Sequence, residues 1–192
     1  MSSIIVVCTG NICRSPVGES ALRALIPSPG LEVTSAGTHA VVDAPAEPEA
    51  QEFLRRELGV RTNHRARQLT KDEAESADLL LAMTEQHRSW IARTAPRAVR
   101  RVFTMREFAQ LMNELQPATE DVSLRDMVMV ASRFRARTRT AGAGSTLDIA
   151  DPYRGTPEQY EESFSSVLVA SSTIARAISI RTTAHHSGDR NE

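Results

Sequence analysis

The sequence is short of several residue types, and each shortage excludes a class of protein. Its 192 residues include two cysteines, Cys8 and Cys13, too few for the disulfide framework of a small secreted domain. It has no run of about 18 apolar residues and no charged segment leading into an apolar one near residue 1, so we expect no membrane insertion, no export signal and a cytoplasmic location. The formal net charge of -1 provides no global field for a polyanion, so we expect no nucleic-acid partner.

Apolar residues make up 41% of the chain, which is enough for the core of one compact α/β domain. Short apolar runs that fit strands occur at residues 4–7, 31–35, 78–83 and 99–103, and stretches with helical spacing lie between them. This alternation predicts right-handed crossovers and a parallel sheet with helices on both faces. We expect one domain over residues 1–180, with an arginine-rich insertion at about 113–147 and a disordered tail at 181–192.

The stretch IIVVCTGNICRSP, residues 4–16, has the pattern of a phosphate-binding loop. An apolar strand runs into Cys8, a loop extends to Arg14, and Ser15 followed by proline is typical of an N-cap and the first turn of a helix. Such a loop directs backbone N–H groups at one small volume, which favours an anion. Gly10 lets the loop turn, Arg14 can bind two phosphoryl oxygens, and the same positive field favours Cys8 as a thiolate nucleophile.

An ordinary strand-to-helix loop with a small buried cysteine is the alternative interpretation of this stretch. A cysteine and an arginine six positions apart are a weak signal on their own, because arginine is frequent in this chain. The preceding strand, the Gly-Asn turn and the Ser-Pro helix start make the phosphate site the better interpretation.

Two motifs together resemble a known family. CTGNICRSP at residues 8–16 is similar to the active-site loop of the low-molecular-weight protein tyrosine phosphatases of the bacterial type, and Asp-Pro-Tyr at residues 151–153 resembles their second signature. The resemblance implies a three-layer, flavodoxin-like α/β fold, in which a four-stranded parallel sheet of order 2-1-3-4 has helices on both faces. It covers residues 4–112 and 148–178 and does not account for the insertion or the tail.

The resemblance also implies an activity, the hydrolysis of phosphotyrosine in proteins through a phosphocysteine intermediate. Cys8 would be the nucleophile, Arg14 the phosphate clamp and Asp151 the general acid and base. No cofactor or metal is expected, because a guanidinium and backbone amides carry the phosphoryl charge. The phosphate-binding loop would comprise Thr9, Gly10, Asn11, Ile12, Cys13 and Arg14.

Supporting residues follow from the same resemblance. Ser35 and His64 alone fit an ordinary turn and a surface loop, but their neighbours, Ser-Ala-Gly at 35–37 and His-Arg-Ala-Arg-Gln at 64–68, match family patterns. Asn11 would hold the loop through hydrogen bonds reaching Ser15, Ser35 and His64. Ile12 and Tyr153 would line the substrate cleft. Many family members have an aromatic residue at one side of this cleft, where this chain has Val41 and Val42.

The sequence also suggests roles for Cys13 and His87. A disulfide between Cys8 and Cys13 under oxidation is one expectation for Cys13, and a small residue that packs well is the other. His87 is expected on the surface of a helix.

Three other functions stay open at this point. Protein arginine phosphatases resemble this chain at LLLAMTEQH and RVFTMREF, but they carry threonine where this chain has Ile12, whose apolar branched side chain favours an aryl ring. Arsenate reductases of the same fold need further cysteines, and a non-catalytic phosphate-binding module would not need both Cys8 and Asp151.

The expected partner is a phosphotyrosine-containing protein, with a bacterial tyrosine kinase as one candidate, while the sequence does not indicate the oligomeric state.

The segment from Asp121 to Arg139 predicts a helix with Val122, Met129 and Phe134 facing partly inward. Its arginines form either a solvated face or a docking surface for an acidic or phosphorylated partner. These arginines are Arg125, Arg133, Arg135, Arg137 and Arg139.

Overall fold

A computed structural model describes residues 2–115, 122–138 and 147–182 of the chain. The strands are β1 (Ser2–Cys8), β2 (Leu31–Gly37), β3 (Leu79–Ala82) and β4 (Val102–Thr104). The helices are α1 (Arg14–Leu25), α2 (Pro48–Leu58), α3 (Lys71–Ser76), α4 (Glu85–Thr94), the 3-10 helix η1 (Pro96–Ala98), α5 (Met105–Glu114), α6 (Leu124–Thr138) and α7 (Pro157–Thr182).

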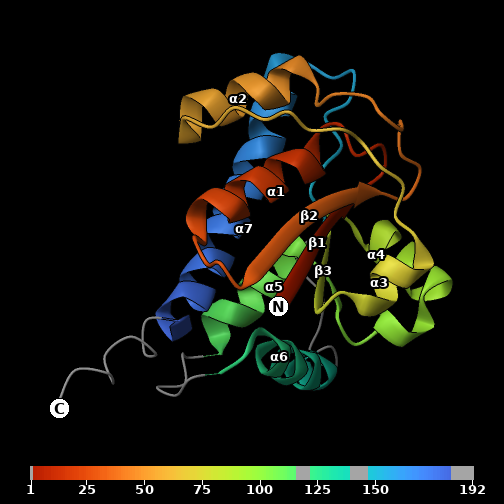
Figure 1. Ribbon diagram of the computed structural model, residues 1–192, viewed down its shortest axis with the longest axis vertical. Coiled ribbons are helices and arrows are strands. Elements are labelled where there is room, and N and C mark those ends of the chain that lie inside the picture. The colour runs from red at the N-terminus through yellow and green to blue at the C-terminus, as the bar shows by residue number, and fades with distance from the viewer. Residues whose placement is uncertain (1, 116–121, 139–146, 183–192) are drawn as a thin grey trace, which may run out of the picture.

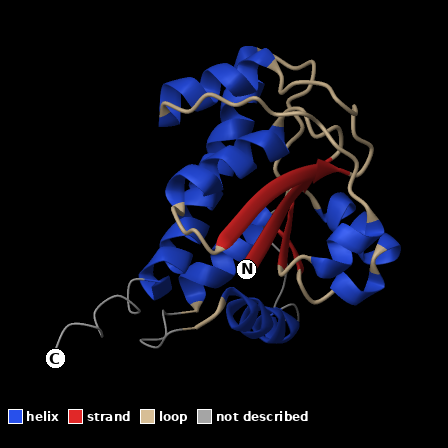
Figure 2. Cartoon of the chain, in the orientation of Figure 1, coloured by secondary structure: helices blue, strands red, loops and turns tan. Residues whose placement is uncertain are grey.

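The described strands form one parallel sheet in the order β2-β1-β3-β4, which confirms the predicted fold (Figure 2). In the register, Cys8 at the end of β1 lies beside Gly37 at the end of β2. The carboxyl ends of the strands therefore meet at one edge of the sheet, which is where parallel sheets bind ligands.

Side chains of each strand alternate between two cores. Ile4 and Val6 face the larger core, which α1, α5, α6 and α7 cover, while Ile5 and Val7 face the smaller one under α3 and α4. Figure 1 shows these two layers on opposite sides of the strands, with α2 packed outside α1 and α7. A fully buried large side chain such as Phe103 contributes about 1.5–3 kcal/mol to the free energy of unfolding.

Two predicted boundaries are wrong. Helix α1 begins at Arg14 with Cys13 as its N-cap and no side-chain cap, so Ser15 is not the N-cap; its hydroxyl instead lies against the sulfur of Cys8. Strand β4 begins at Val102 rather than Val99, because η1 and a turn occupy the preceding residues and leave Val99 half exposed. Thr70 and Thr104 each begin a capping box, at the starts of α3 and α5.

The predicted helix in the arginine-rich segment is confirmed as α6, and Val122 and Phe134 are partly buried against the core as predicted. Leu124, Met127, Val128 and Ala131 are buried, whereas Met129, predicted to face inward, is 47% exposed. Helix α7 continues two residues into the predicted tail, to Thr182. Residues 116–121 and 139–146 of the predicted insertion and the rest of the tail lie outside the described residues. Over the ranges described, no helix combines the length and apolar character needed to cross a membrane.

Candidate active site

The loop that follows β1 turns its backbone carbonyl groups outward. The carbonyl oxygens of Cys8, Thr9, Gly10 and Ile12 accept hydrogen bonds at 2.8–3.0 Å from N–H groups of the segment 38–47. A peptide group directs its N–H opposite to its C=O, so the N–H groups of the loop point toward the loop interior. The chain thus lines one small volume with donors, which suits an anion.

Two donors meet the sulfur of Cys8, which is buried at the end of β1. The backbone N–H of Asn11 lies 3.3 Å from Sγ, and the hydroxyl oxygen of Ser15 lies 3.0 Å from it. Both groups can donate to an anionic sulfur, so the geometry around Cys8 suits a thiolate.

Asn11 is fully buried and holds the loop by bonds in several directions. Its Nδ2 donates to the hydroxyls of Ser15 and Ser35, both at 2.9 Å, and its Oδ1 accepts from the backbone N–H of Arg67 at 2.9 Å. Its backbone oxygen lies 2.7 Å from Nε2 of His64. Asn11 has φ of 57°, a left-handed conformation that asparagine tolerates better than most residues. The structure thus brings all the expected supporting residues together around Asn11, with Ser15 and Ser35 at its amide side chain and His64 at its backbone oxygen.

Arg14 connects the loop with the segment that carries Asp151. Its side chain is buried, Nη1 donates to the carbonyl oxygen of Ile149 at 2.9 Å, and Nη2 is 2.5 Å from Oδ2 of Asp151. Ile149 is in turn fixed to the end of β3, because its N–H donates to the oxygen of Met83. Nε of Arg14 is buried without a hydrogen-bond partner among the described residues, and a phosphoryl oxygen would supply one.

Apolar side chains surround the entrance to the loop. Ile12 is buried with 7% of its surface exposed, Tyr153 is half exposed, and Val41 and Val42 are exposed where the expected aromatic residue is missing. Val41 belongs to this entrance because its N–H donates to the oxygen of Gly10 at 3.0 Å. Side chains of Ile12 and Val41 both lie beside Gly10, so the loop has apolar neighbours.

The expectation that His87 lies on the helix surface is wrong. It is buried, with Nε2 2.8 Å from the hydroxyl of Thr9 and Nδ1 2.8 Å from that of Thr84. Burial, and secondarily the positive charge of Arg14, lowers the pKa of His87 to about 4, against the opposing effect of Asp151. The Thr84 hydroxyl accepts from the His87 backbone and can donate to Nδ1, which leaves Nε2–H to donate to Thr9.

Both cysteines are free and buried. Burial, followed by the negative charges of Cys8 and Glu47, raises the pKa of the Cys13 thiol, so this thiol stays protonated at neutral pH. The disulfide between the two cysteines stays a prediction.

Sequence reasoning missed Glu19 as well as His87. The hydroxyl of Ser35 donates to Oε2 of Glu19 at 2.5 Å, and Nδ1 of His64 lies 3.8 Å from the same oxygen. Glu19 lies four residues after Ser15 on α1, so helical spacing could have placed it beside the loop. The amide of Arg67 carried no such signal, since backbone donors leave no trace in residue type. Within the described ranges, no group of three or more His, Cys, Asp or Glu could hold a metal ion.

Comparison with known proteins gives matches in sequence and in structure. The model of the low molecular weight phosphotyrosine protein phosphatase family matches residues 3–123. Etp, a low molecular weight protein-tyrosine-phosphatase of Escherichia coli K12, is 43% identical over 95 residues, 50% of this chain and 63% of Etp. A protein-arginine-phosphatase of Bacillus subtilis is 44% identical over 107 residues, 55% of this chain and 71% of that relative.

The fold is similar to that of the YwlE arginine phosphatase from Geobacillus stearothermophilus, with a TM-score of 0.72, 28% identity, and coverage of 97% of this chain and 98% of that one. The sequence match to Etp spans less than two thirds of that relative's length, whereas the family model spans more than half of this chain. The chain belongs to the low molecular weight phosphotyrosine protein phosphatase family.

Proposed function

We propose that this protein hydrolyses phosphotyrosine in proteins through a phosphocysteine intermediate. The observation that carries the proposal is the convergence on one volume of a buried thiol, the loop N–H groups and the Arg14 guanidinium, with Asp151 paired to the same guanidinium. These are a nucleophile, a set of donors for the phosphoryl oxygens and a candidate acid, which phosphoryl transfer requires.

In the first step, the Cys8 thiolate attacks phosphorus and a sulfur–phosphorus bond forms. The bond from phosphorus to the phenolic oxygen breaks, and Asp151 gives its proton to that oxygen. The loop N–H groups and Arg14 stabilise the charge on the equatorial oxygens during transfer. Because the dianion competes for the guanidinium, substrate binding frees the Asp151 carboxyl from Arg14, and the freed carboxyl takes up a proton from solvent on the leaving-group side before the transfer.

In the second step, a water molecule attacks the phosphocysteine. The Asp151 carboxylate takes a proton from this water, the sulfur–phosphorus bond breaks, and inorganic phosphate leaves with Cys8 restored as a thiolate. Asn11, Ser15, Ser35 and His64 do not touch the substrate in this scheme. They hold the loop in the conformation in which its donors already point at the phosphoryl group, so little reorganisation is needed.

Phosphotyrosine is favoured as substrate by the apolar entrance. Ile12 and Tyr153 offer an aryl ring apolar surface, and Val41 extends it. Phosphoarginine is the second candidate, because arginine phosphatases are among the relatives in both sequence and structure. The partners are accordingly phosphoproteins, a bacterial tyrosine kinase among the candidates, and a free thiol nucleophile suits the reducing cytoplasm.

The test compares turnover of a phosphotyrosine peptide and a phosphoarginine peptide by the wild type, Cys8→Ser and Asp151→Asn. We expect faster turnover of the phosphotyrosine peptide, loss of activity in Cys8→Ser, and a loss of about 10²- to 10⁴-fold in Asp151→Asn. Preferential hydrolysis of phosphoarginine would instead favour the second candidate. Wild-type activity in Cys8→Ser would exclude both.

A further inference from the structure

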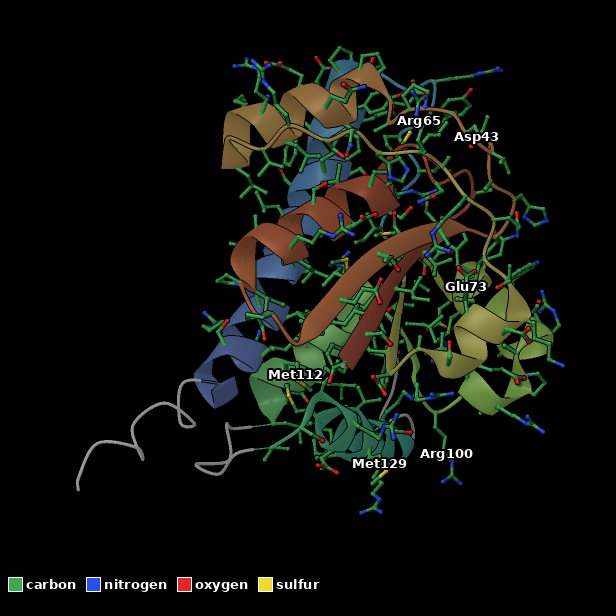
Figure 3. The ribbon with its side chains drawn as sticks, viewed as in Figure 1. Asp43, Arg65, Glu73, Arg100, Met112 and Met129 are labelled. Atoms are coloured by element: carbon green, nitrogen blue, oxygen red, sulfur yellow. The ribbon has the colours of Figure 1, made fainter. Side chains whose placement is uncertain are left out.

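A second basic site lies at the end of the sheet opposite to the phosphate loop. Arg101 immediately precedes β4, and Arg125 on α6 is bonded to Asp78, which immediately precedes β3, so both mark the amino ends of strands. Figure 1 shows α6 beside this end, and Figure 3 shows Met129 and Arg100 there, far from Asp43 and Arg65, which flank the loop. A groove of about 810 Å³ runs between α6 and the segment before β4, and its arginines are Arg97, Arg100, Arg101, Arg125, Arg133 and Arg135.

Three of these arginines are held by the fold. Arg101 donates to the carbonyl oxygens of Ala77 and Glu75, both at 2.7 Å. Arg125 lies 2.7 Å from the carboxylate of Asp78, and Arg135 stacks over the ring of Phe103, 4.2 Å from its centroid. These contacts fix three guanidinium groups along the walls of the groove.

The remaining three are turned to solvent. The side chain of Arg97 is 86% exposed and reaches Glu75 only at 3.7 Å. Arg100 and Arg133 are exposed, and within the described ranges neither of them forms an ion pair. Arginines of the groove form ion pairs with Glu75, Asp78 and Glu107, and Glu107 is shared with Arg88 outside the groove.

The described residues that line the groove include six arginines and no Asp or Glu, although the whole chain has a net charge of -1. The fields of charges that line one concave groove add within it, because its low-dielectric walls focus them. An anionic ligand would relieve the repulsion among them. The charge surplus belongs to this groove and not to the molecule as a whole.

The groove also has an apolar part. Val128 is buried beneath it and Met129 is 47% exposed, and both line it. Methionine adapts its shape to different apolar partners. An occupant that matches both features carries carboxylates and aliphatic side chains together, as an acidic protein segment does.

Nucleic acid and membrane fit this surface less well. None of the described residues that line the groove is aromatic, so bases have no stacking platform. A bilayer presents a broad surface, which a concave groove bounded by two segments does not contact along its floor. We propose that the groove between α6 and the segment before β4 binds an acidic, partly aliphatic segment of a partner protein.

The proposal is tested with a fluorescent peptide of four Glu-Glu-Leu repeats and a matched peptide of four Gln-Gln-Leu repeats. Fluorescence anisotropy at low salt measures their affinity for the full chain. We expect the acidic peptide to bind at least tenfold more tightly than the matched one, and its affinity to fall as salt is raised. Equal affinity for the two peptides would overturn the proposal.

Two charge-reversed proteins locate the binding. Arg100→Glu with Arg133→Glu changes two exposed groove residues, and Arg61→Glu with Arg93→Glu makes the same change in charge at exposed positions outside the groove. We expect at least tenfold weaker peptide binding for the first and less than twofold change for the second. Equal losses in the two proteins would show a non-local charge effect and contradict the proposal.

Turnover of 4-nitrophenyl phosphate separates this proposal from the proposed activity. It should be unchanged in both double variants, because neither touches the phosphate loop. The same anisotropy assay includes a thymidine dodecamer and phosphatidylserine vesicles. The assignment to a protein segment would be wrong if the wild type bound the dodecamer or the vesicles more tightly than the acidic peptide, and if the Arg100→Glu, Arg133→Glu protein no longer bound them.

Discussion

The two ends of the sheet use arginine in opposite ways. At the carboxyl end, Arg14 is buried and each terminal nitrogen has a fixed acceptor, Ile149 or Asp151. At the amino end, Arg100 and Arg133 extend into solvent beside arginines that the fold already holds. Arginine carries the same charge at both ends of the sheet, so burial and fixed acceptors determine its role. A guanidinium held in place can match a defined phosphoryl geometry, whereas exposed guanidinium groups attract many arrangements of negative charge.

The contrast extends to neighbouring polar groups. At the loop after β1, the Asn11 amide donates to the hydroxyls of Ser15 and Ser35, and Ser35 donates to Glu19, so these buried side chains are satisfied by neighbours of fixed geometry. A satisfied buried network is rigid and sensitive to loss of one member. Around the groove, water solvates the exposed charges, so single changes there should cost little stability.

The largest expected difference between the two ends of the sheet appears when one arginine at each end is replaced by lysine. Arg14→Lys replaces a planar fork by a single point charge and should lower kcat/KM for 4-nitrophenyl phosphate by roughly 10²- to 10³-fold. Arg101→Lys, the matched change at the amino end, should alter kcat/KM by less than twofold. Steady-state kinetics of both variants check this. Similar losses in the two would mean that the ends are not functionally distinct.

The next effect concerns the network around Asn11. Asn11→Ala removes three side-chain hydrogen bonds and places alanine at φ of 57°, so the free energy of unfolding should fall by about 2–4 kcal/mol. Urea unfolding measures this change, and kcat should fall as well because the loop donors lose their support. A loss below about 1 kcal/mol would mean that the loop holds its shape without the amide.

A smaller effect follows from His87. The folded protein binds a proton on His87 only near pH 4, while the unfolded chain does so near the ordinary value of 6.5. Between these pH values the unfolded state binds more protons. The contribution of neutral His87 to the free energy of unfolding is therefore fully present above pH 6.5 and is lost as the pH falls toward 4. Lowering the pH from 8 to 5 should therefore reduce the free energy of unfolding by about 2 kcal/mol through His87.

Urea unfolding of wild type and His87→Gln at both pH values measures the contribution of His87. Glutamine keeps a donor for Thr9 but does not titrate, so the loss of stability on acidification should be smaller by that amount in the variant. An identical pH dependence in the two proteins would contradict the assignment of a buried neutral imidazole.

The smallest effect is expected at the amino end. Arg125→Ala removes the ion pair with Asp78, but the Arg125 side chain is 70% exposed, so the free energy of unfolding should fall by only about 1 kcal/mol. Asp78→Ala should cost more, because the buried carboxylate also accepts from the N–H of Ser3 at 3.0 Å. Thermal or urea unfolding of the two variants gives the order, and the reverse order would contradict it.

The position of the loop after β1 and of its polar side chains was predictable from sequence because the pattern is local. Cys8, Asn11 and Arg14 lie within one strand-loop-helix unit, and the apolar periods around that unit indicated the parallel sheet. His87 was not predictable in the same way. Its imidazole is buried only because the start of α4 lies beside the loop after β1, and residues 78 positions apart leave no periodic pattern.

The arginines of α6 show the same limit. Their spacing predicted a helix, but which of its faces is buried depends on packing against α5 and the sheet, so Met129 was assigned to the wrong side. The groove itself needs a second segment, the residues before β4, and no property of the α6 sequence indicated that Arg97, Arg100 and Arg101 lie opposite to it.

One measurement tests the central claim most directly. Wild-type protein is mixed with 4-nitrophenyl phosphate, quenched in acid within milliseconds and digested, and mass spectrometry locates any phosphoryl group on the chain. The mechanism predicts one phosphoryl group on Cys8, formed and lost at rates that account for turnover. Turnover with no phosphoryl group on the sulfur, or with the group on another residue, would contradict it.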